Sequence, residues 1–146
     1  MAFSAKRIMS GTWGELWLDG ELVAECYKFQ AKDAYTRESV TQCGTLRQGK
    51  KLTQIEGTGT VGLRKVRSLM AQKIGTITAA GNDPRFTLIS KVDDPDAYGA
   101  ERIAFYGVAF DDMTWADWEA GVMGNVECPF TYEGCEPLTL VEGGVN

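Results

Sequence analysis

The stretch QIEGTGTVGLRKVRSLM, from Gln54 to Met70, predicts a strand that leads directly into a helix. Successive side chains of a strand point to opposite faces. One face of this strand therefore carries Ile55, Gly57, Gly59, Val61 and Leu63, and the other carries Glu56, Thr58, Thr60, Gly62 and Arg64. Each glycine weakens a strand by roughly 0.5–1 kcal/mol. Something must therefore lie close against the glycines, and the polar face must have a use or face water.

Apolar residues recur at three- and four-residue spacing after this strand, which predicts one amphipathic helix. They are Val66, Leu69, Met70, Ile74 and Ile77. The run Gly81-Asn82-Asp83-Pro84 ends the helix, because glycine and proline both terminate helices. The stripe is expected to be a packing face rather than a cofactor site.

The residues before this stretch predict a hairpin and a protrusion. Asp19-Gly20, flanked by apolar residues, is a strong hairpin signal. The second strand then runs from Glu21 to Cys43 without proline or glycine. At ~3.3 Å per residue it is longer than a domain of this size is wide, so it bends or protrudes. The polar, basic segment from Cys43 to Gln54 follows as a long loop, which is either a solvated hairpin tip or a contact arm.

Three further strands are predicted after the helix, at residues 85–92, 101–110 and 126–133. Pro129 places the last of them at an edge or a bulge. Between the last two strands, Trp115 and Trp118 could cover an edge of the core or meet a partner, and burial within the monomer is the favoured interpretation. The fold class is mainly β (α+β), with antiparallel strands in a sandwich or barrel, one packed helix and a long protruding loop.

The composition of the chain argues against several classes of function. The chain has 146 residues, 44% of them hydrophobic, and suits one globular domain. A formal net charge of −5 argues against a protein that binds nucleic acid tightly, because an acidic surface repels phosphate groups. The sequence contains no histidine, which excludes Ser–His and Cys–His catalytic pairs within the chain. It shows neither a secretory signal nor a membrane-spanning run. We therefore expect the protein to be made, and at least initially kept, in a reducing cytosol.

Candidate chemical sites are few. Asp93, Asp94, Asp96 and Glu101 could bind Ca²⁺ or serve a small β-barrel enzyme, but they lack the order of a calcium loop and are better interpreted as a polar turn. GTGTVG lacks the features of a nucleotide-binding loop. The cysteines are interpreted as reduced packing residues, with a Cys128–Cys135 disulfide as the alternative. We therefore expect no catalytic residue, no cofactor and no metal.

Four blocks in a fixed order give the chain a family resemblance. They are the hairpin GTWGELWLDGE, the block EGTGTVGLRKV, the block RFTLISKVDDPDAYGAERIAFYGVAFDD, and the block PFTYE. This succession resembles the tail tube proteins of contractile (myovirus-type) phage tails and of related phage-like or defective prophage elements. The resemblance covers nearly the whole chain and implies that residues 1–146 form a single tail tube domain.

The resemblance implies a structural subunit that is not an enzyme. Such subunits form hexameric rings that stack into a tube inside a sheath above a baseplate, and DNA passes through without specific binding. The subunit would be assembled in the bacterial host cytoplasm and located in the virion tail, with no membrane partner. The alternative is the ring-forming tube protein of a type VI-like secretion system or of a bacteriocin-like contractile injection system.

Two sets of residues are then expected to serve assembly. The subunit-contact arm would comprise Leu46, Arg47, Gln48, Lys50, Lys51 and Leu52. The polar strand face, lining a lumen or a seam between subunits, would comprise Glu56, Thr58 and Thr60. On the opposite face, Ile55, Val61 and Leu63 would face the helix of the same subunit. Gly57 and Gly59 would let that helix or a neighbouring chain approach closely. Without the resemblance, the polar strand face would be interpreted as the exposed side of an ordinary amphipathic strand.

Overall fold

The computed structural model describes residues 2–142 and is built mainly of antiparallel strands. The strands are β1 (Gly14–Leu18), β2 (Glu21–Leu22), β3 (Cys26–Val40), β4 (Gly49–Arg64), β5 (Phe86–Val92), β6 (Glu101–Phe110), β7 (Asn125–Tyr132) and β8 (Gly134–Thr139). The helical elements are the 3-10 turns η1 (Ala5–Arg7) and η2 (Gly11–Trp13), the π-helical turn η3 (Ala71–Gly75) and the helix α1 (Thr76–Ala79). The predicted fold class is confirmed.

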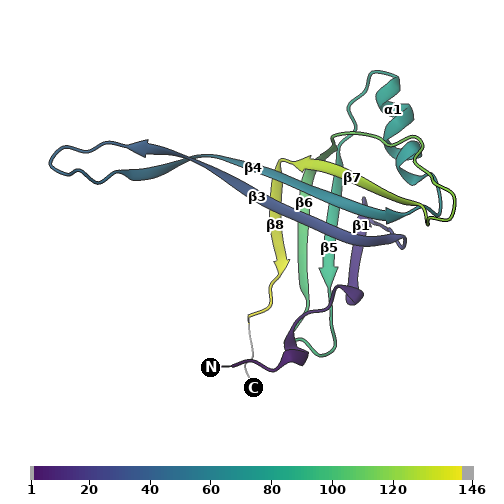
Figure 1. Ribbon diagram of the computed structural model, residues 1–146, viewed down its shortest axis with the longest axis horizontal. Coiled ribbons are helices and arrows are strands. Elements are labelled where there is room, and N and C mark those ends of the chain that lie inside the picture. The colour runs from purple at the N-terminus through teal and green to yellow at the C-terminus, as the bar shows by residue number, and fades with distance from the viewer. Residues whose placement is uncertain (1, 143–146) are drawn as a thin grey trace.

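Two layers of strands cross one another and share β6 (Figure 1). The N-terminal sheet has the order β2-β1-β5-β6-β8, and the arm sheet has the order β6-β7-β4-β3. At Gly107, β6 adopts a positive φ of 64°, and there it passes from β5 and β8 to β7. A side chain at Gly107 would meet Glu133, so glycine is needed both for the backbone angle and for the space.

The core lies between the two sheets and is rich in aromatic side chains. Phe130, Leu18, Leu88, Val61 and Val108 are all less than 2% exposed. Phe29 stacks on Phe130 with ring centroids 5.7 Å apart, and Phe105 meets Tyr132 edge-on at 5.0 Å. Such pairs contribute about 0.5–1.5 kcal/mol beyond the burial of their area.

Two of the glycines of β4, Gly57 and Gly59, are explained by these aromatic rings. Gly57 is paired with Tyr132 of β7, and Gly59 with Phe130. A Cβ atom at either glycine would overlap the ring opposite, and at Gly59 it would also meet the carbonyl oxygen of Gln30. The glycines therefore make room for rings of a neighbouring strand in the same sheet. The predicted close approach of a helix or a second chain at these positions is wrong.

The helix is present but differs from its prediction. Helical backbone covers 69–79 and bends through one π-turn, which has more residues per turn than an α-helix. Leu69, Met70 and Ile74 are buried as predicted, whereas Ile77 is 38% exposed because the π-turn rotates it away from the core. Val66 is 76% exposed and lies in the connection before the helix.

The predicted long strand is interrupted, and one strand was not expected. A turn at residues 24–25 separates β2 from β3, so the hairpin at Asp19-Gly20 ends after two residues. The hairpin itself is confirmed, with Asp19 and Gly20 at φ 49° and 84°. Strand β8, which pairs with β6, was missed because its polar residues and Pro137 do not alternate like a half-buried strand.

Candidate assembly surfaces

The arm is a β-hairpin that extends far from the body (Figure 1). Pairing of β4 with β7 begins at Gly57, so residues 49–56 of β4 pair with β3 alone. The two strands stay paired as far as Val40 and Gly49, and residues 41–48 close the tip. The predicted protrusion is confirmed, but the expected loop from Cys43 to Gln54 is too long, because its second half is strand.

A bulge shapes the arm near its middle. The register shifts between Thr36 and Arg37, and the Thr53 hydroxyl donates to the Thr36 carbonyl oxygen at 3.1 Å. Bulges increase the local twist of a two-stranded ribbon. At the tip, Gly44 has φ 83°, and the Thr45 hydroxyl accepts from the backbone N–H of Arg47 at 3.2 Å. The glycine and this hydrogen bond together define the turn at the tip.

The structure divides the predicted arm residues between loop and strand. Leu46, Arg47 and Gln48 lie in the tip, while Lys50, Lys51 and Leu52 lie at the start of β4. All six are exposed, and Leu46 is fully so. Among the ion pairs of the described residues, none involves Arg47, Lys50 or Lys51. The arm thus offers apolar and cationic groups that its own chain does not use.

The predicted polar face lies on the outer side of the arm sheet, away from the core. Thr58 and Thr60 are half-buried between β3 and β7, and Glu56 is exposed where the arm leaves the body. On the same face, Lys28 and Glu127 form an ion pair of 3.2 Å. The three predicted residues are thus brought onto one surface. Ile55 points the other way but is 59% exposed, since no second layer covers the arm, so its predicted contact with the helix is wrong.

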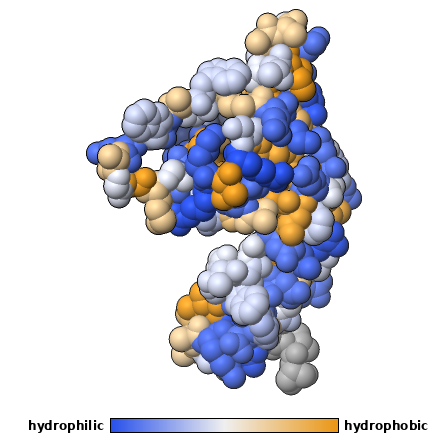
Figure 2. Space-filling model, turned by 90° about the vertical axis from the view of Figure 1, so that its right-hand side faces the viewer, coloured by the Kyte–Doolittle hydropathy of each residue, from blue (hydrophilic) through white to orange (hydrophobic). Residues whose placement is uncertain are grey.

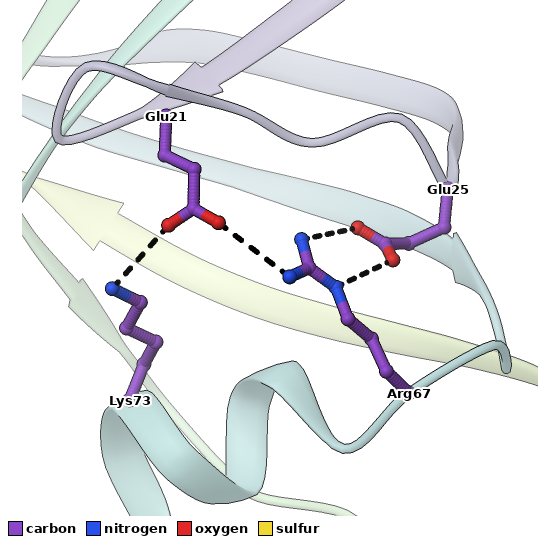
Figure 3. Close-up of polar contacts among 4 residues, drawn as sticks. All are labelled: Glu21, Glu25, Arg67 and Lys73. Carbon is purple, nitrogen blue, oxygen red and sulfur yellow. Dashed lines mark hydrogen bonds and ion pairs between the residues drawn. The ribbon is translucent and has the colours of Figure 1, made fainter.

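An ionic network that the sequence did not reveal fixes the connection between β4 and the helix (Figure 3). Arg67 donates to both carboxylate oxygens of Glu25, at 2.8 and 3.1 Å, and approaches Glu21 at 3.5 Å. Lys73 lies 3.6 Å from the other oxygen of Glu21. The Arg67 hydrogen bond holds the pKa of Glu25 below its ordinary value. The network joins the β2–β3 turn to a segment 42 residues away.

The loop of residues 111–124 between β6 and β7 exposes several large apolar side chains. Trp118 is 85% exposed and Trp115 62%, so their predicted burial within the monomer is wrong. The ring of Trp115 lies against Gly75, where a Cβ would overlap it. The position of that glycine in the helix is thereby explained, while most of the indole remains exposed.

The acidic segment after β5 is a structural turn. Asp94 is 7% exposed, and its two oxygens accept from the backbone N–H groups of Ser10 and Asp96, both at 2.9 Å. Arg7 reaches the Asp96 carbonyl at 3.1 Å and lies over the ring of Tyr98. These contacts fasten the N-terminal segment to the turn. They support the polar-turn interpretation over the calcium and enzyme alternatives for Asp93, Asp94, Asp96 and Glu101. Within residues 2–142, no cluster of potential metal ligands is found.

The cysteines are all free thiols, so the alternative Cys128–Cys135 disulfide is not formed. Cys128 is buried, and burial raises its pKa to about 11. Cys26 is half-buried, whereas Cys43 and Cys135 are exposed, so the packing interpretation is right for two cysteines and wrong for the other two. In the part of the chain described by the structure, no helix is long and apolar enough to cross a membrane.

Comparisons with known proteins agree with this architecture. A family described as "phage tail tube protein" matches residues 1–139. A Bacillus subtilis (strain 168) relative, the phage-like element PBSX protein XkdM, is 35% identical over 135 residues, covering 91% of this chain and 92% of the relative. The family resemblance predicted from the sequence is confirmed.

Solved structures with low sequence identity share the fold. A chain in the sheath–tube complex of an extracellular contractile injection system in its extended state has a TM-score of 0.73 at 9% identity, covering 95% of this chain and all of that one. A chain in the tube-terminating cap of the anti-feeding prophage has a TM-score of 0.73 at 10% identity, covering 96% and 97%. At such identities, the likeness concerns the fold alone.

Proposed function

Because the chain belongs to the phage tail tube protein family, we propose that its copies form hexameric rings that stack into the inner tube of a contractile phage or phage-like tail. The observation that carries the proposal is the arm. It is an exposed two-stranded ribbon whose outer residues pair only with each other, with a fully exposed Leu46 and with cations outside the ion pairs found in residues 2–142. A structural subunit that is not an enzyme would use this ribbon to bind the next copy.

Open sheet edges supply a second reason for assembly. Strand β3 ends the arm sheet and is paired on one side only, along 15 residues. Such a long edge invites uncontrolled pairing unless it is covered. A ring covers the edge of every subunit with the same contact, because a heterologous interface repeated around a rotation axis closes on itself.

The polar face suits the wall of a conduit for DNA. Thr58 and Thr60 present hydroxyl groups, and the neighbouring Lys28 is paired with Glu127 rather than free to hold phosphate. A net charge of −5 also disfavours phosphate binding. We expect duplex DNA to bind weakly or not at all at physiological salt. Sub-micromolar binding that survives 150–200 mM salt, about the range in which phosphate contacts weaken strongly, would contradict this.

The fold neighbours favour one second candidate. Tube chains of contractile injection systems share this architecture, so the subunit could belong to an injection system or a bacteriocin-like tail that carries no genome. In either case the expected partners are a sheath and a baseplate, and assembly would take place in the host cytoplasm. Isolating particles from the producing bacterium and testing them for nuclease-protected DNA would separate the two candidates.

Electron microscopy of the purified protein tests the proposal directly. We expect stacked six-fold rings or tubes with a central channel. A protein that stays monomeric across concentrations and salt conditions, or that forms rings of another symmetry, would contradict the hexameric tube. Saturable turnover of a substrate that is lost in Asp93→Ala or Asp94→Ala would contradict the non-enzymatic role.

A further inference from the structure

The loop of residues 111–124, here called the acidic loop, exposes apolar side chains that its own chain leaves uncovered. Trp118 and Met123 are 85% and 75% exposed, and Trp115 and Val122 are each more than 60% exposed. Large apolar side chains gathered in this way mark interaction surfaces. Tryptophan in particular is enriched where proteins bind one another.

The acidic loop also carries charge of one sign. Asp111, Asp112, Asp117 and Glu119 lie within it, and the same stretch contains no lysine or arginine. Among the ion pairs found in residues 2–142, none involves these four carboxylates. A partner for this surface should therefore bring cations together with an apolar group.

The arm tip has the complementary composition. Arg47, Lys50 and Lys51 follow the fully exposed Leu46 within five residues, and Glu38, which is opposite Lys51, is the one acidic residue among residues 37–54. The arm tip is basic and the loop is acidic, so their charges are complementary. Both also expose apolar side chains that could pack against one another.

The two surfaces lie at opposite ends of the molecule (Figure 1). Strand β4 begins at Gly49 in the arm and ends at Arg64, which is paired with Asn125, and Lys65 N–H donates to the Gly124 carbonyl at 2.7 Å. Figure 2 looks onto the end opposite the arm and shows hydrophobic side chains exposed among strongly hydrophilic ones. Copies placed head to tail along the long axis would bring an arm tip against an acidic loop.

We propose that the acidic loop is the receptor for the arm tip of a second copy, in the adjacent ring. A head-to-tail contact that does not close on itself propagates along an axis, which is what stacking requires. This inference rests on the proposed tube function and names the partner of the arm. The other acidic surface, the turn after β5, is already used to hold the N-terminal segment through Asp94.

Charge reversal on each surface, and on both together, tests the contact. The variants are D117K/E119K in the acidic loop, K50E/K51E in the arm, and the combination of all four changes. D93K/D96K, which reverses two exposed carboxylates in the turn after β5, is the matched control. Circular dichroism and the unfolding midpoint confirm that each variant is folded. Assembly is measured by sedimentation and electron microscopy.

We expect each double variant to lose at least tenfold in sedimenting tubes, the combined variant to regain them, and the control to assemble like the parent. Tubes of normal length from D117K/E119K, or no recovery in the combined variant, would overturn the inference while leaving the tube function intact. A parent protein that forms no tubes would contradict the proposed function itself.

A cross-link provides a measurement independent of charge. Cys43 is an exposed thiol at the arm tip. Because Cys135 is also an exposed thiol, both variants are made in a Cys135→Ser background. In tubes of Glu119→Cys, a short bis-maleimide should join Cys43 of one copy to the new thiol of the next and give a ladder of oligomers in a denaturing gel. Asp96→Cys is the control and should give none. A ladder from Asp96→Cys but not from Glu119→Cys would show that the arm tip contacts the turn after β5 instead of the acidic loop, and would overturn the inference.

Discussion

The two halves of β4 have the same backbone conformation but opposite surroundings. Residues 57–63 lie between β3 and β7 and are buried or half-buried, whereas residues 49–56 pair with β3 alone and are exposed throughout. The inner half carries glycines that receive aromatic rings, and the outer half carries lysines and exposed apolar side chains. One strand therefore passes from a part that stabilises the fold to an exposed part that we propose binds another subunit.

This difference means that stability and assembly should respond to different residues. The inner half contributes through close packing, where each buried group affects the free energy of unfolding. The outer half buries almost nothing, so it contributes little to the stability of a single chain. Substitutions can therefore separate folding from assembly along the same strand.

The largest effect is expected at the ring that fills the space over Gly59. Phe130 is 0% exposed, stacks on Phe29 and touches Gly59. Phe130→Ala should lower the free energy of unfolding by about 3–5 kcal/mol, because it removes the ring and leaves a cavity. Chemical denaturation measures this change. A loss below about 1 kcal/mol would show that the aromatic–glycine packing is not what holds the arm sheet together.

A matched pair of glycine substitutions compares the two halves directly. A Cβ at Gly57 would overlap the Tyr132 ring, which is held in place by a hydrogen bond of 2.7 Å from its hydroxyl to Asp33. Gly57→Ala should therefore destabilise the protein by about 1–3 kcal/mol, as overpacking does. At Gly49 nothing lies within 4 Å of an added Cβ, so Gly49→Ala should leave the unfolding midpoint nearly unchanged or raise it slightly. Equal losses in both variants would contradict the comparison.

The ionic network predicts a smaller, pH-dependent effect. The folded pKa of Glu25 lies below its ordinary value of 4.5, so its contribution to stability is present above that value and is lost as the pH falls through the folded pKa. Glu25→Gln should lower the unfolding midpoint at pH 7, by less than Gly57→Ala does. The difference between this variant and the parent should shrink as the pH is lowered below 4.5. A difference that stays constant down to pH 3 would mean that the Glu25 charge is not what matters.

Local signals were enough to predict much of the fold. The Asp19-Gly20 turn, the strand of residues 101–110 and the buried half of the helical stripe depend on neighbours in sequence, and each is found in the structure. The length of the strand before the arm also predicted the protrusion correctly.

Features that depend on distant partners could not be predicted. Gly57 pairs with Tyr132, which lies far from it in the chain, so no local pattern indicates that an aromatic ring rather than a helix lies against the glycine. The bidentate contact of Arg67 with Glu25 spans 42 residues and leaves no local pattern. The strand pairing of residues 49–54 was missed because exposed strands lack the alternation that marks half-buried ones.

The smallest effect on stability should accompany the largest effect on assembly, at the arm tip. Deletion of residues 46–51 with a short glycine bridge removes Leu46, Arg47, Lys50 and Lys51, all of which are exposed. Surface changes of this kind usually alter stability by no more than about 0.5 kcal/mol, so the monomer should stay folded. Each lost ion pair with a neighbour contributes only ~0.2–1 kcal/mol, but every subunit repeats the contact, and the sum decides whether rings stack. Electron microscopy should therefore show no long tubes. If the shortened chain formed tubes as well as the parent, or if it failed to fold, the arm would not be the separate assembly element that the two halves of β4 indicate.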